Sequence, residues 1–161
     1  MSIAELLADA AGRAVRYLEG LGLRGVAPEP AALAGLRRFD EPLPEVPADP
    51  VTTLTLLDEV GSPATVASAG GRYFGFVIGG SLPVTVAASW LATAWDQNNA
   101  LPVMSPVSAR IHDVVAGWLV DLLGLPEGTQ AAFLTGASMA NTTALAAARD
   151  HQLALVGWDV Q

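Results

Sequence analysis

The residues best suited to chemistry form a turn at residues 135–141, with the sequence T-G-A-S-M-A-N. The apolar run at residues 131–135 predicts a short strand before the turn, and the alanine-rich run after it predicts a helix from Ser138 to about Arg149. We expect Ser138 to be the helix N-cap. Unpaired N–H groups and the positive end of a helix dipole at such a corner can bind an anion. The alternative is an ordinary corner, because the motif is neither G-x-G-x-x-G nor a P-loop.

Other side chains offer little for nucleophilic or metal chemistry. The two histidines, His112 and His151, lie where a lone histidine is more often structural, and no pair has metal-ligand spacing. The residue types of a Ser-His-Asp catalytic triad are present in Ser138, His112 and the aspartates. Their spacing does not support a triad, because G-A-S-M-A lacks the G-x-S-x-G elbow. The sequence has no cysteine and no lysine, so no thiolate and no Schiff-base lysine are available in these residues.

The elements that must position the turn are mostly helical. Apolar spacing and caps predict helices at residues 2–20, 50–60, 81–97 and 105–123, with a shorter one within 30–39. We expect Gly61 and Pro63 to end the second helix, and Gly124 and Pro126 to end the last one. Residues 40–49 are predicted to be extended because of four prolines, Pro42, Pro44, Pro47 and Pro50.

Two further segments separate these helices. Residues 68–83 hold five glycines and three aromatic residues, which favours either a backbone that approaches another group closely or a loop with an edge strand. The polar run at residues 96–99 is typical of a solvated helix end, with an active-site position as the alternative. One strand cannot make a sheet, so the sequence is interpreted as the opening of an α/β fold.

Composition limits the classes of partner. The sequence is 52% hydrophobic and 15% charged, against about 45–50% and about 25% in typical domains, so we expect a partner subunit or further chain to cover apolar surface. The net charge of −8 argues against nucleic acid and anionic membranes as partners. With no long apolar run and no basic leader region, a cytoplasmic protein is expected.

Four stretches between residues 68 and 150 carry a family resemblance: A-G-G-R-Y-F-G-F-V-I-G-G-S-L-P, W-D-Q-N-N-A-L-P-V-M-S-P, W-L-V-D-L-L-G-L-P and F-L-T-G-A-S-M-A-N-T-T-A-L-A-A-A-R-D. In order and approximate spacing they resemble the pyridoxal-phosphate-dependent group II amino acid decarboxylases, which include the aromatic-amino-acid and glutamate decarboxylases. The resemblance implies a fold-type-I α/β fold. Residues 1–80 would be its helical, dimer-clasping segment, and residues 81–161 the incomplete beginning of its large cofactor-binding domain.

The resemblance also implies binding residues, carried over by position. Ala137, Ser138 and Met139 would meet the phosphate of pyridoxal 5′-phosphate, chiefly through backbone N–H groups. Residues 97–101 would lie near the family's subunit boundary and active-site mouth.

A second stretch would line the substrate pocket. It comprises Ile78, Gly79 and Gly80, and Ile78 replaces a polar residue seen in aromatic-amino-acid decarboxylases. The substrate is therefore an amino acid whose identity stays open.

In the family, the cofactor-stacking histidine, the aspartate facing the pyridine nitrogen and the Schiff-base lysine lie downstream, and His151 and Asp159 do not match them. The sequence is interpreted as the N-terminal portion of a decarboxylase, a carbon–carbon lyase that works as a homodimer or with a complementary chain. These 161 residues alone are expected to be inactive. The alternatives are an inactive truncated dimerisation partner and an aminotransferase or lyase of the same fold.

Overall fold

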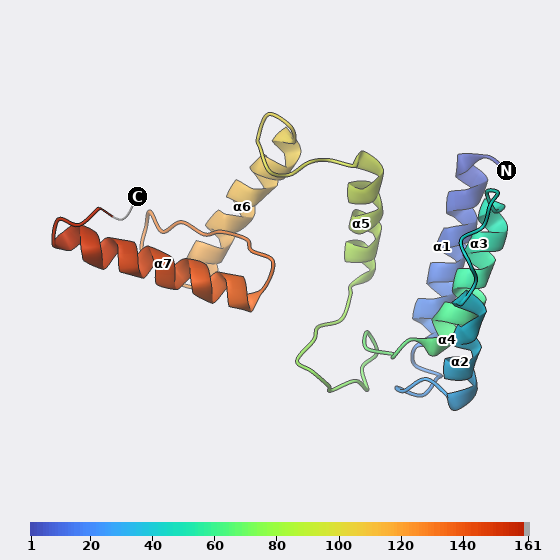
Figure 1. Ribbon diagram of the computed structural model, residues 1–161. Helices are drawn as coiled ribbons and strands as arrows, with labels where there is room; N and C mark the ends of the chain where they lie inside the picture. Colours follow the sequence, from blue (N-terminus) through green and yellow to red (C-terminus); the bar gives the residue numbers. More distant parts are fainter. Residues whose placement is uncertain (160–161) are drawn as a thin grey trace. The chain divides into compact units, whose positions relative to one another are not determined.

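The computed structural model describes residues 1–159, and all regular secondary structure in that range is helical. The chain divides into two compact units, Met1–Ser89 and Trp90–Gln161 (Figure 1). Both units are built from helices joined by loops, so each must obtain its stability from helix caps and from contacts between side chains.

The first unit begins with α1, Ile3–Gly20, which confirms the helix predicted at residues 2–20. Ser2 is its N-cap, and the Ser2 Oγ accepts a hydrogen bond of 3.3 Å from the Glu5 N–H. The Glu5 carboxylate accepts one of 2.7 Å from the Ser2 N–H, so the two residues form a capping box.

The rest of the first unit is a set of short helices. They are α2 (Pro30–Gly35), the 3₁₀ turn η1 (Leu36–Phe39), α3 (Pro50–Leu56), the π turn η2 (Leu57–Gly61) and α4 (Ser62–Ala64). The Asp49 carboxylate caps α3 by accepting a 3.0 Å hydrogen bond from the Thr52 N–H. Residues 40–49 hold no regular element, as the prolines predicted, and they are exposed.

One predicted helix end is wrong. Gly61 and Pro63 do not stop the helix, which widens into the π turn η2 and continues to Ala64. Proline has no N–H to donate, and the wider turn just before it lets the helical path go on without that bond.

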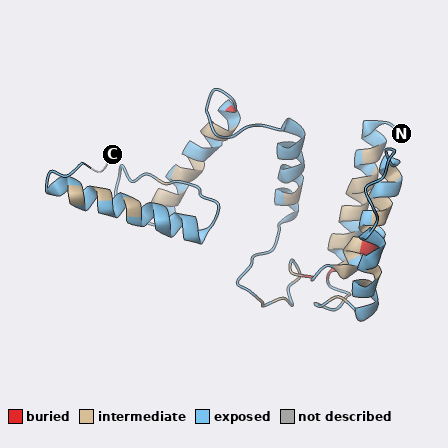
Figure 2. Ribbon diagram, in the orientation of Figure 1, coloured by how far each residue is buried: buried red, intermediate tan, exposed pale blue. Residues whose placement is uncertain are grey.

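Within the first unit, α1 packs against α3, and α2 packs against α4 (Figure 1). The buried apolar side chains of the described residues are Leu21, Val60 and Ala67, and all three belong to this unit (Figure 2). This small core is supplemented by polar contacts around Arg13, which bridges α1 to the segment from α3 to η2.

The second unit contains α6 (Pro106–Leu122) and α7 (Ala137–Leu155), and α5 (Pro83–Trp95) runs across the division between the units. In its described part Ser105, 1% exposed, is the one buried residue. Large apolar side chains of this unit are exposed, Trp118 by 68% and Leu122 by 80%. This unit therefore has helices but almost no apolar core of its own.

The strand predicted at residues 131–135 is wrong, because these residues form a loop in the structure. A strand is stable only when its N–H and C=O groups pair with a neighbouring strand. No residue between 1 and 159 adopts a strand, so residues 131–135 have no such partner. The described part of the chain is helical, and the α/β class predicted from the sequence stays a proposal.

Candidate functional site

The turn that the sequence singles out leads directly into α7. Gly136 is extended, with φ 164° and ψ 174°, and α7 starts at the next residue, Ala137. The first backbone hydrogen bond of the helix runs from the Ala140 N–H to the Gly136 carbonyl, at 3.0 Å. Since the helix leaves its earliest donors without intrahelical acceptors, the N–H groups of Ala137, Ser138 and Met139 are unpaired among the described residues.

Ser138 is not the N-cap, so that prediction is wrong. Gly136 occupies the cap position, and no side chain closes the first turn of α7. Ser138 lies inside the helix, where its carbonyl accepts a 2.9 Å hydrogen bond from the Thr142 Oγ1. A capping side chain would have occupied one of the first amides, so its absence leaves more donors open than the sequence indicated.

The other described helices of six or more residues start differently. A side chain caps α1 through Ser2 and α3 through Asp49. A proline without an N–H takes the first position of α2, α5 and α6. Only α7, within the described chain, has neither device in its first turn.

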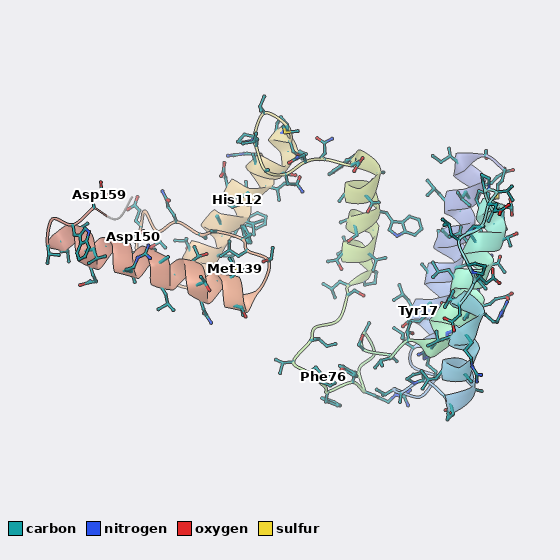
Figure 3. All side chains as sticks on the ribbon, viewed as in Figure 1. Tyr17, Phe76, His112, Met139, Asp150 and Asp159 are labelled. Carbon is teal, nitrogen blue, oxygen red and sulfur yellow. The ribbon has the colours of Figure 1, made fainter. Side chains whose placement is uncertain are left out.

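The surroundings of these amides suit an anion. Ala137, Ser138 and Met139 are all exposed, and Met139 is labelled at the start of α7 in Figure 3. The first turn of α7 contains no acidic residue, so no carboxylate competes for its N–H groups. The helix dipole adds partial positive charge at the same end. This geometry supports binding of a phosphate or carboxylate group.

The proposed substrate segment, Ile78, Gly79 and Gly80, lies in a loop of the first unit and is exposed. The two residues before it, Phe76 and Val77, have φ values of 55° and 52°. A β-branched residue is strained in this left-handed region, so Val77 adopts a conformation that its own side chain disfavours.

Arg72 and Gly75 shape the beginning of that loop. The Arg72 guanidinium donates to the carbonyls of Gly22 and Arg24, which ties the loop to the chain after α1. A Cβ at Gly75 would come within 2.8 Å of the Tyr73 hydroxyl oxygen, which is a contact inside the loop itself. Gly71 and Gly79 have no atom within 4 Å of such a Cβ, so the predicted approach to another group stays a prediction. Residues 78–80 belong to the first unit and the α7 turn to the second, and the structure describes each separately.

The polar run near residues 97–101 is engaged in local hydrogen bonds. The Asn98 Oδ1 accepts from the Ala100 N–H at 2.9 Å. The Ser108 hydroxyl donates to the Asn99 Oδ1 at 2.6 Å and accepts from the buried Ser105 at 3.0 Å. Sequence reasoning missed this serine pair, because nothing in the spacing of residues 99, 105 and 108 showed that a turn would bring them together.

Neither histidine belongs to a recognisable catalytic or metal site. The His112 ring meets Phe133 edge-to-face, with centroids 5.0 Å apart and planes at 82°, and so connects α6 to the loop before α7 (Figure 3). Across residues 1–159, no group of three or more His, Cys, Asp or Glu side chains is arranged to hold a metal ion. None of the helices in this range combines the length and apolar character needed to cross a bilayer.

Comparison with known proteins identifies a distant relative. The chain is 28% identical over 116 residues to an aromatic-L-amino-acid decarboxylase of Bacillus atrophaeus. The match covers 72% of this chain and 24% of the relative, so the chain spans about a quarter of that protein's length. No protein-family model and no solved structure matches the chain. The chain is therefore similar, at the distance of a remote relative, to part of a decarboxylase.

Proposed function

We propose that the chain is the N-terminal part of a pyridoxal-phosphate-dependent amino acid decarboxylase and supplies its phosphate-binding turn. The observation that carries the proposal is the open first turn of α7, with its three unpaired N–H groups at Ala137, Ser138 and Met139. These residues are the ones that the motif resemblance carries onto the cofactor phosphate. The decarboxylase name of the distant relative supports the same reading.

The residues present fit a phosphate group. Ala137, Ser138 and Met139 offer backbone donors at a helix N-terminus, with no acidic side chain in the turn. The Ser138 hydroxyl forms no hydrogen bond among the described residues, so it is free to add a fourth donor. When bound, pyridoxal phosphate supplies the electron sink that stabilises the carbanion left when the α-carboxylate departs as carbon dioxide.

The turn alone is too weak to hold the cofactor. A helix terminus contributes about 0.3–1 kcal/mol to an anionic group and up to about 2 kcal/mol in a favourable site, whereas micromolar affinity needs about 8 kcal/mol. The 161 residues include no lysine to bond the cofactor covalently. We therefore expect the chain alone neither to retain pyridoxal phosphate nor to decarboxylate amino acids.

Exposed Ile78, Gly79 and Gly80 are proposed to line the amino acid pocket, where Ile78 offers only van der Waals contact to a substrate side chain.

A second copy or a complementary chain is proposed to complete the fold, with α1 at the interface. The exposed apolar side chains of both units support this proposal. Light scattering at micromolar concentration should find a dimer or larger assembly, and a well-behaved monomer would count against it.

The function is tested on the complete translation product of the gene, supplied with pyridoxal phosphate, a panel of amino acids and a 2-oxo acid as amino acceptor. A decarboxylase releases carbon dioxide and the corresponding amine in equal amounts. Release of a keto acid without carbon dioxide would instead identify an aminotransferase. If neither product forms, the proposed function is wrong, and a non-catalytic dimerisation partner becomes the better interpretation.

A further inference from the structure

We draw no further inference here: the strongest candidate, the apolar cavity of about 510 Å³ that Ala10, Leu18 and Leu57 help to line between α1 and the segment from α3 to α4, carries none because nothing in the structure shows what covers it.

Discussion

The first turns of α1 and α7 differ in what their backbone N–H groups donate to. At α1, the Ser2 hydroxyl and the Glu5 carboxylate accept hydrogen bonds from backbone N–H groups, so the helix satisfies its own donors. At α7, Gly136 supplies no side chain, and the amides that follow stay open. A closed first turn contributes to stability, whereas an open one gives up that contribution and keeps its donors for a ligand.

The same contrast extends to how the two units are held. Arg13 donates from Nε to Asp9 at 2.8 Å, from Nη1 to Asp58 at 3.2 Å and from Nη2 to Thr55 at 2.9 Å. The bonds to Asp58 and Thr55 connect α1 to a part of the chain more than forty residues away. In the second unit, the ion pair of Arg149 with Asp150 joins sequence neighbours and fixes nothing at a distance. The first unit therefore depends on a few specific side chains, and their removal should lower its stability.

The largest effect on stability is expected from Arg13→Met. Its side chain is only 17% exposed, and the substitution removes three hydrogen bonds and leaves Asp58 with a weaker partner. Urea denaturation followed by circular dichroism should show a marked fall in the midpoint. The matched control is Arg16→Met, because Arg16 is 66% exposed and reaches Asp58 at 3.7 Å. Equal shifts in the two variants would mean that Arg13 does not brace the unit.

A smaller effect is expected from removing the cap of α1. Ser2→Ala should cost about 1 kcal/mol, within the range of about 0.5–2 kcal/mol typical of N-cap serines. The matched control is Ser138→Ala, which caps nothing and should change stability little or raise it slightly because alanine favours helix. Amide hydrogen exchange of Leu6 in α1 and of Ala140 in α7 reports both results, because each donates the first backbone hydrogen bond of its helix. A loss at Ser138 as large as at Ser2 would restore Ser138 as a cap and contradict the contrast.

A still smaller effect should appear as a pH dependence. The backbone N–H of Ser2, with help from its hydroxyl, lowers the pKa of Glu5, and the backbone N–H of Thr52 lowers the pKa of Asp49. The unfolded chain therefore takes up protons first. The stabilisation is complete above the ordinary carboxyl range of about pH 4 and is lost as the pH falls through the lowered pKa values.

The starts of α1 and α3 should accordingly fray in acid, whereas the start of α7, which has no acidic residue in its first turn, should not. Amide chemical shifts of Glu5, Thr52 and Ala140 recorded from pH 6 downward test this difference. Glu5→Gln should abolish the response at α1 alone. A response at Ala140 in the same pH range would show that the acid effect is global.

Helices were predictable from the sequence because their signals are local. The apolar spacing that begins after Ser2, and Asp49 before Pro50, place the starts of α1 and α3 correctly. The structure at residues 131–135 was not predictable in the same way, because a strand depends on a partner strand that the local sequence does not supply. The N-cap at Ser138 failed for a related reason: glycine also suits a cap position, and the helix begins two residues earlier than the serine indicates.

The predicted site, like the fold, was predictable only where its signals are local in the sequence. The position of the α7 turn followed from Gly136 and the alanines after it, but the number of open amides depended on which residue became the cap. The serine pair that holds Asn99 could not be predicted, because it requires the turn between α5 and α6 to be folded first.

The central claim is that the first turn of α7 binds a phosphate group. The most direct measurement is an amide chemical-shift titration of the isotope-labelled chain with pyridoxal phosphate, using pyridoxal as the phosphate-free ligand control. Two variants at Ala137 distinguish the effect of the backbone N–H from the effect of a changed side chain. Ala137→Pro removes one N–H, and proline suits both a first helical position and the extended Gly136 before it. Ala137→Ser keeps the N–H.

We predict phosphate-dependent chemical-shift changes of the Ala137, Ser138 and Met139 amides, with a dissociation constant of about ten millimolar or more. The shifts at Ser138 and Met139 should persist in Ala137→Ser and decrease in Ala137→Pro. Titration with pyridoxal should leave all three amides unchanged. Equal shifts with both ligands, or shifts that Ala137→Pro leaves intact, would contradict the account and remove the phosphate-binding turn from the proposed function.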